Sequence, residues 1–160
     1  MKVCVLMPTY NEMGPLTQTV EAVVQVAPDL DLLIIDDNSP DGTGDLGDLL
    51  ANKHPQLRVL HRQAKQGLGR AYIAGFEWAI ENGYDYIVQM DADGSHRPDD
   101  LPLVVEAAAE NRLVIGSRWV PGGAVLNWPW YRQWISRAGN LYARLTLRSH
   151  VKDITAGFRC

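Results

Sequence analysis

The sequence contains two cysteines and no long apolar stretch. Cys4 lies inside a short apolar run and Cys160 is the last residue, so the pair forms neither a disulfide framework nor the spacing of metal ligands. No segment approaches the ~20 apolar residues of a membrane-spanning helix, and the first residues, MKVCVLMPTYNE, lack the apolar core of a secretory signal. We therefore expect a reducing, cytoplasmic setting and a chain that neither spans a membrane nor is exported.

Acidic residues are nearly absent from the C-terminal third of the chain. Residues 1–111 contain 7 Lys and Arg against 18 Asp and Glu, whereas residues 112–160 contain 8 against Asp153 alone. The basic residues are interspersed with aromatic ones and accompany no nucleic-acid-binding motif. We expect no nucleic-acid partner, and we expect the basic part to bind phosphate groups or an anionic membrane surface.

Length and composition fit one globular domain over residues 1–160, with 46% apolar and 21% charged residues. Apolar runs predict strands at residues 2–7, 30–36, 57–61, 86–90 and 112–117, and helical spacing with capping residues predicts helices at 15–27, 46–52, 69–83, 98–110 and 131–147. Strands that are apolar on both faces are typical of a mostly parallel sheet covered by helices. The sequence therefore predicts an α/β fold.

Two carboxylates follow the fourth expected strand directly. Asp91 and Asp93 stand one residue apart, and in open α/β sheets ligands bind beyond the carboxyl ends of the strands. Carboxylate oxygens suit Mg²⁺ or Mn²⁺ that is shared with substrate phosphates. The alternative is a pair of solvated loop acids or helix caps, and this short pattern alone does not decide between the two. Asp99 and Asp100 are expected to be first-turn helix acids.

A second acidic pair ends the second expected strand. Asp36 and Asp37 can accept hydrogen bonds from a base or a ribose, or they can belong to a turn that is capped by Asp41 or Thr43. Polar, turn-rich segments of this kind also follow the first, fourth and fifth expected strands. We therefore expect a ligand site along this edge of the sheet.

Six motifs occur in a fixed order along the chain. They are MPTYNE, IIDDNSPDGT, KQGLGRAYIAGF, MDADGSHRP, GSRWVPGG and DITAGFR. In this order they resemble the dolichyl- or polyprenyl-phosphate mannose synthases, a branch of glycosyltransferase family 2 with the GT-A fold. The resemblance covers residues 3–159, and SPDGT, GSRWVPGG and GFR favour this branch over polysaccharide synthases.

The resemblance implies an inverting, metal-dependent transfer of mannose from GDP-mannose to a polyprenyl (dolichyl-type) monophosphate. The product would serve cell-envelope or protein glycosylation. The metal would be Mg²⁺ or Mn²⁺, and the protein would be peripheral on the cytosolic face of a membrane, alone or through a membrane-anchoring partner. A phosphate monoester with a second pKa of about 6 is mostly dianionic at neutral pH, so this reaction needs no catalytic base.

The resemblance also implies roles for individual residues. The donor would be bound by Pro8, Tyr10, Glu12, Ile35, Asp37, Lys65, Ala92 and Arg118. Asp91, Asp93 and Arg118 would be catalytic, and Asp91 and Asp93 would bind the metal. Ser95 is a further candidate ligand, although some members carry Gln there and a hydroxyl is a weaker ligand.

The acceptor phosphate would be bound by Ser136, Arg137, Asp153 and Arg159, with Asp153 holding one of the arginines. Forked guanidinium groups suit bidentate contact with phosphate. Nearby, Trp128, Trp130, Tyr131 and Trp134 beside Arg132 form either an amphipathic element in a membrane interface or a loop and helix packed on the sheet. The sequence leaves both interpretations open.

Three alternative functions follow from the same residues. A UDP-glucose-dependent polyprenyl-phosphate glucosyltransferase would differ in base discrimination around Tyr10, Glu12 and Asp37. A Mg²⁺-dependent phosphohydrolase would place its aspartyl nucleophile after the first strand, whereas the DAD motif follows the fourth. A non-catalytic module that binds a nucleotide sugar or a membrane stays open, because family members continue past GFR whereas this sequence ends at Cys160. The C-terminal part of the family domain is thus expected to be absent, either because the sequence is a fragment or because it is an unusually short member.

Overall fold

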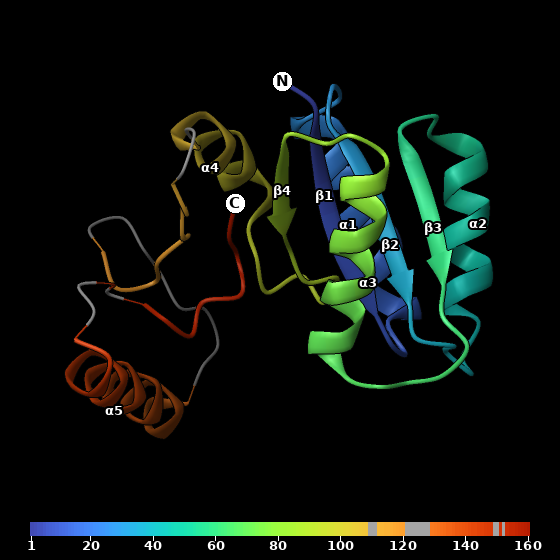
Figure 1. Cartoon of the computed structure of the whole chain (residues 1–160). Helices are drawn as coiled ribbons and strands as arrows, with labels where there is room; N and C mark the ends of the chain where they lie inside the picture. The colour runs from blue at the N-terminus through green and yellow to red at the C-terminus, as the bar shows by residue number, and fades with distance from the viewer. Residues whose placement is uncertain (109–111, 121–128, 149–150, 152) are drawn as a thin grey trace.

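A four-stranded parallel sheet lies at the centre of the structure (Figure 1). The strands are β1 (Val3–Thr9), β2 (Asp31–Asp36), β3 (Leu57–His61) and β4 (Tyr86–Gln89), in the spatial order β3-β2-β1-β4. This computed structural model describes residues 1–108, 112–120, 129–148, 151 and 153–160. The predicted α/β fold with a parallel sheet is confirmed.

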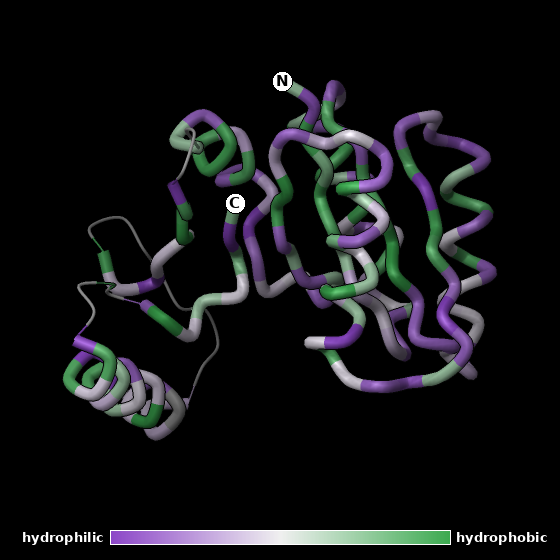
Figure 2. The backbone as a smooth tube through the Cα atoms, in the orientation of Figure 1, coloured by the Kyte–Doolittle hydropathy of each residue, from purple (hydrophilic) through white to green (hydrophobic). Residues whose placement is uncertain are grey.

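Helices cover both faces of the sheet (Figure 1). They are α1 (Met13–Val26), α2 (Thr43–Lys53), α3 (Leu68–Glu81), a short 3₁₀ turn η1 (Pro98–Asp100) and α4 (Leu101–Ala107), with α5 (Trp130–Thr146) further along the chain. Successive strand side chains point to opposite faces. Val5 and Ile34 therefore pack under α1, α2 and α4, whereas Leu6 and Ile35 pack under α3. Figure 2 shows the apolar residues concentrated along the strands.

The prediction of a fifth strand in the parallel sheet at residues 112–117 is wrong. Ile115 forms only an isolated antiparallel bridge with Arg159, and Arg159 forms a second one with Gln89 of β4. Backbone hydrogen bonds of 2.8 and 2.9 Å join the amides of Val114 and Gly116 to residues 160 and 158. Residues 158–160 therefore lie between β4 and residues 114–116, because the free edge of β4 pairs with a remote segment that the local apolar pattern does not identify.

α5 lies beside the C-terminal residues and away from the four strands (Figure 1). Its Asn140 side chain donates to Asp153 at 3.2 Å and accepts from the Ile154 amide at 2.8 Å. These bonds attach the helix to residues 153–154 through a single polar side chain. No helix within the described ranges is both long and apolar enough to cross a membrane.

The aromatic side chains at the start of α5 face outward. Trp130 and Trp134 are 75% and 71% exposed, so the interpretation of these two residues as core tryptophans is wrong. Trp128 and the side chain of Arg132 lie outside the described residues. The outward face of α5 is thus apolar where it begins, and this is unusual for a helix that faces only water.

The contact between α3 and the sheet requires a glycine at position 75, and this can be tested. An added Cβ would lie 2.4 Å from Ile35 Cδ1 and 2.9 Å from Leu6 Cδ1. Overpacking of a core costs about 1–3 kcal/mol. We expect Gly75→Ala to lower the free energy of unfolding in urea by about that amount.

The matched control is Gly69→Ala in the same helix, where the added Cβ meets no heavy atom of the described residues within 4 Å. This variant should leave the free energy of unfolding unchanged or slightly higher, because alanine is the better helix former. Equal stability of the two variants would contradict the close packing of α3.

Candidate functional site

A pocket of about 250 Å³ lies at the carboxyl ends of the strands. Its lining comprises Pro8, Thr9, Tyr10 and Glu12 after β1, Asp37 after β2, Lys65, Gly67, Leu68 and Ala71 before and in α3, and Asp91, Ala92 and Asp93 after β4. We call it the strand-end pocket. It brings together most of the residues expected to bind the donor and both expected metal ligands.

Two expected donor residues lie elsewhere. Ile35 is fully buried in β2 and packs against α3, so its side chain faces the core and not the pocket. Arg118 lies in a second pocket, described below. The sequence assigned these residues by family position, which does not specify the side-chain direction.

Asp91 is held from several sides. The Tyr72 hydroxyl donates to Oδ1 of Asp91 at 3.2 Å, and the Asp91 amide donates to Nδ1 of His96 at 2.9 Å. Neither Tyr72 nor His96 was among the residues expected at the site. Burial raises the pKa of Tyr72, and the Asp91 carboxylate raises it further. The hydroxyl therefore stays protonated and remains a donor.

Asp93 is more exposed than Asp91, and its carboxylate is oriented by a contact within its own loop. The Ser95 amide donates to Asp93 Oδ1 at 2.9 Å, while Gly94 has a φ of 75°. Within the described residues, no group of three or more His, Cys, Asp and Glu side chains is arranged to hold a metal by itself. The two carboxylates fit a hard divalent ion only if a ligand such as a diphosphate supplies further oxygens.

The raised pKa of Glu12 indicates that negative charge is concentrated around this pocket. Burial raises its pKa above the ordinary value of 4.5, and Asp93, Asp41 and Asp91 raise it further. A cation at the pocket would relieve this repulsion. The electrostatics therefore favour a cation bound beside Glu12, Asp91 and Asp93, the three of these four acids that line the pocket.

The acidic pair after β2 divides into two roles. Asp36 accepts from the Thr9 hydroxyl at 3.1 Å and from the Ser39 amide at 3.0 Å, so it shapes the turn and does not line the pocket. Asp37 lines the pocket, but its carboxylate is buried, paired with Arg62, and accepts from the Gln66 amide at 3.3 Å. Arg62 is a contact that the sequence analysis missed.

A cation–π contact lies at the pocket wall. The Lys65 ammonium lies 3.6 Å from the centroid of the Tyr10 ring. Both residues line the pocket, and both were expected there. The segment that leads into α3 is thus folded onto the end of β1, where an amine and an aromatic face are available to a ligand.

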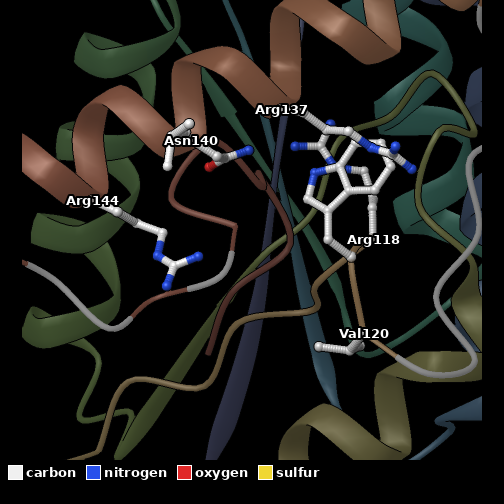
Figure 3. A pocket seen from close by; sticks show the side chains of 7 residues that line it. Arg118, Val120, Arg137, Asn140 and Arg144 are labelled. Carbon is white, nitrogen blue, oxygen red and sulfur yellow. The ribbon is translucent and has the colours of Figure 1, made fainter.

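A second pocket of about 480 Å³ is strongly basic (Figure 3). Its lining comprises Arg118, Trp119, Val120, Arg137, Asn140, Leu141 and Arg144. We call it the basic pocket. Asp153 is fully buried beneath it and accepts from Arg118 Nε and Nη2 at 2.8 and 2.7 Å. As expected, Asp153 holds one of the arginines, and the bonds from Arg118 keep the pKa of Asp153 low although burial opposes them.

Two buried polar atoms in the described part of the chain lack a protein partner, one in Trp119 of the pocket lining and one in Ser136, which precedes the lining residue Arg137 but does not itself line the pocket. Among the described residues, Trp119 Nε1 and Ser136 Oγ are buried without a hydrogen bond. The Arg137 guanidinium lies 4.6 Å from the Trp119 ring centroid. Buried polar atoms are normally satisfied, so this cluster of cations and unsatisfied donors has the chemistry of an anion site.

Arg159 is directed away from the basic pocket. Its Nε and Nη2 donate to the carbonyls of Ala156 and Ile154, each at 2.6 Å. It is also absent from the described lining of both pockets. Arg159 thus braces the turn after Asp153 in this structure, whereas it was expected to bind phosphate.

Comparison with known proteins gives a family for the whole chain. A family model described as "Glycosyl transferase family 2" matches residues 4–160. An undecaprenyl-phosphate mannosyltransferase of Micrococcus luteus is 53% identical over 99% of this chain and 65% of the relative. A polyprenol monophosphomannose synthase of Mycolicibacterium smegmatis is 49% identical over 97% of this chain and 59% of the relative. The chain therefore spans less than two thirds of the length of these relatives.

Among solved structures, mannosyltransferase PcManGT from Pyrobaculum calidifontis, in complex with GDP-Man and Mn²⁺, has a similar fold. The TM-score is 0.60 at 24% identity, over 69% of this chain and 33% of that one. At this identity the likeness concerns the fold. Together with the family match, it confirms the GT-A fold that the motifs indicated.

The carboxylates around Glu12 repel one another at neutral pH. We therefore predict that replacing Glu12 by a neutral residue raises the free energy of unfolding, and that the gain depends on pH. A raised pKa means that the folded state holds the Glu12 proton more tightly than the unfolded state, so this group's contribution to stability falls as pH rises above 4.5. Glu12→Gln should therefore raise the free energy of unfolding of the metal-free chain at pH 7. The gain should vanish at a pH below 4.5.

Glu21→Gln is the control of opposite sign, since hydrogen bonds from Lys53 and His54 lower the pKa of Glu21. That variant should lose stability at pH 7 and not at low pH. Urea unfolding at both pH values measures both variants. A loss of stability in Glu12→Gln at pH 7 would contradict the inferred repulsion between carboxylates at the strand-end pocket.

Proposed function

The chain belongs to glycosyl transferase family 2, and we propose that it transfers mannose from GDP-mannose to a polyprenyl monophosphate. The observation that carries the proposal is the strand-end pocket, which gathers Asp91 and Asp93 with Tyr10, Asp37 and Lys65 at one edge of the sheet. The names of the two mannose-transferring relatives support the sugar and the lipid phosphate. The reaction inverts the anomeric carbon.

The strand-end pocket is proposed to bind the donor. The base and ribose would lie against Pro8, Tyr10, Glu12, Asp37 and Lys65, with Ala92 beside them, and Asp91 and Asp93 would hold Mg²⁺ or Mn²⁺ against the diphosphate. When bound, the ion supplies positive charge that stabilises the departing GDP. Ser95 is a further candidate ligand through its exposed hydroxyl.

The basic pocket is proposed to bind the acceptor phosphate. Arg118 and Arg137 supply charge, and the unsatisfied Ser136 hydroxyl supplies a further hydrogen-bonding group. An oxygen of the phosphate forms a bond to mannose C1 as the bond from C1 to the GDP oxygen breaks. The electron pair leaves with GDP, and because the phosphate is already ionised no proton has to be removed. Asp153 and Arg159 act by holding the walls of the site.

Membrane docking is proposed for the outward face of α5. Trp130, Trp134 and Leu145 are highly exposed on this helix, which contains Arg137 and Arg144 but no acidic residue. Aromatic side chains with nearby arginines are favoured at the lipid–water interface. The protein would thus be peripheral on the cytosolic face of a membrane, which holds its lipid substrate.

Calorimetric titration of GDP-mannose, with and without Mn²⁺, tests the donor site directly. We expect wild-type binding to depend on Mn²⁺ and to exceed UDP-glucose binding, and we expect Asp93→Ala to remove the Mn²⁺-dependent part. The loss should exceed about tenfold, because even outer-shell partners of a metal contribute 10–100-fold.

Asp99→Ala is the control for this titration, since Asp99 is an exposed acid of η1 outside the pocket. Stronger binding of UDP-glucose would establish the glucosyl alternative. Donor binding without transfer to a polyprenyl phosphate, in a chain of the relatives' full length, would favour a non-catalytic module. Unchanged binding by Asp93→Ala would refute the metal site.

Sedimentation with anionic phospholipid vesicles tests membrane docking. Leu145→Ser and Trp134→Ser on α5 should each weaken binding by about 10–150-fold, because each removes apolar area worth about 1.5–3 kcal/mol when buried. Leu49→Ser on α2 is the matched control, since Leu49 is 67% exposed and Leu145 is 71% exposed. Equal binding by the α2 and α5 variants would contradict a specific docking face.

A further inference from the structure

The end of β4 leaves the Asp91 amide without a partner in the sheet. Successive amides of a strand point to opposite sides: the Met90 amide donates to Leu6 of β1 at 3.0 Å, whereas the Gln89 amide donates to Arg159 on the outer edge at 2.7 Å. The Asp91 amide therefore faces the outer edge, beyond the last of these pairs. A backbone amide that is not exposed to water needs an acceptor. His96 supplies it, because its Nδ1 accepts the Asp91 amide at 2.9 Å.

This hydrogen bond fixes the tautomer of His96. Nδ1 accepts a hydrogen bond from the Asp91 amide and therefore carries no proton, so the ring proton of the neutral imidazole lies on Nε2. Nε2 is 3.7 Å from Asp91 Oδ2. The Tyr72 hydroxyl donates to the other oxygen, Oδ1, at 3.2 Å. The Asp91 carboxylate therefore lies between two donor groups that come from α3 and from the following loop.

His96 is itself held by the C-terminal segment. The ring stacks on Phe158 at 5.4 Å between centroids, with 19° between the planes. Gly157 leaves the space for this arrangement, since an added Cβ would lie 3.2 Å from His96 Cε1 and 3.3 Å from Asp91 Oδ2. Residues 157 and 158 thus pack against the imidazole and the carboxylate together.

We propose that His96 is a positioning residue, which holds Asp91 in its metal-binding orientation and is kept in place by Phe158 and Gly157. The proposal rests on the assignment of Asp91 as a metal ligand in the proposed function. In this proposal His96 acts on Asp91 and is not itself a metal ligand. His96 orients the Asp91 carboxylate in two ways, by accepting the Asp91 backbone amide at Nδ1 and by placing Nε2 near Oδ2. Outer-shell contacts of this kind tune the affinity of a metal site.

The first test measures Mn²⁺ affinity in the presence of GDP, and GDP affinity without metal. His96→Leu should weaken Mn²⁺ binding by about 10–100-fold and leave metal-free GDP binding unchanged. His96→Asn should restore most of the affinity, because the asparagine carbonyl can accept the Asp91 amide in place of Nδ1. Gly157→Ala should weaken Mn²⁺ binding without altering His96 itself.

His54→Leu is the matched control, because the side chains of His54 and His96 are 12% and 15% exposed and His54 pairs with Glu21 instead. It should leave Mn²⁺ affinity unchanged. Wild-type Mn²⁺ affinity in His96→Leu would overturn the proposal. An equal loss of metal-free GDP binding would also overturn it, since that result indicates general distortion of the pocket.

A second measurement separates this proposal from the proposed function. Amide hydrogen exchange needs no metal, and the Asp91 amide should exchange slowly in the wild type and in His96→Asn but at least tenfold faster in His96→Leu. Slow exchange in His96→Leu would overturn the positioning role. Protected wild-type exchange together with absent Mn²⁺ binding would instead refute Asp91 as a metal ligand, and with it the metal-positioning role.

Discussion

Parallel pairing of β1 with both of its neighbours is the constraint on which the rest of the structure depends. A parallel pair cannot be joined by a tight hairpin, so the chain must cross a face of the sheet before each return. All carboxyl ends then lie along one edge, and Thr9 stands opposite Asp36, which stands opposite His61. The polar segments after these strands therefore meet in one pocket, although no local signal joins them.

Charge is distributed between the two pockets in opposite senses. At the strand-end pocket, burial and then neighbouring carboxylates raise the pKa of Glu12, and the repulsion between the carboxylates diminishes when a cation binds. At the basic pocket, the buried Asp153 neutralises Arg118, but Arg137 and Arg144 remain on its wall. The proposed donor, with its metal, and the proposed acceptor phosphate each meet the polarity that suits them. The charge asymmetry of the sequence thus corresponds to two sites rather than to one surface.

The features that could be predicted from the sequence are those that local patterns of residues determine. Apolar runs identified the four parallel strands, and motif order identified most of the strand-end pocket, because turn residues directly follow each strand. The prediction of a parallel strand at residues 112–117 was wrong, because these residues pair with residues 158–160, which are remote in sequence. The contacts of Tyr72 with Asp91 and of Arg62 with Asp37 were missed for the same reason: they join separate elements, and tertiary packing alone sets their distances.

The insertion of residues 158–160 beside β4 also affects the order in which the protein forms. During synthesis these residues leave the ribosome after every strand of the parallel sheet. Until they arrive, the outer edge of β4 has unpaired backbone groups, and residues 114–116 have no neighbour in the sheet. Unpaired strand edges are prone to association with other chains. A sheet that forms before residues 158–160 are in place has an open edge at β4, and protection by a chaperone would matter most at that point.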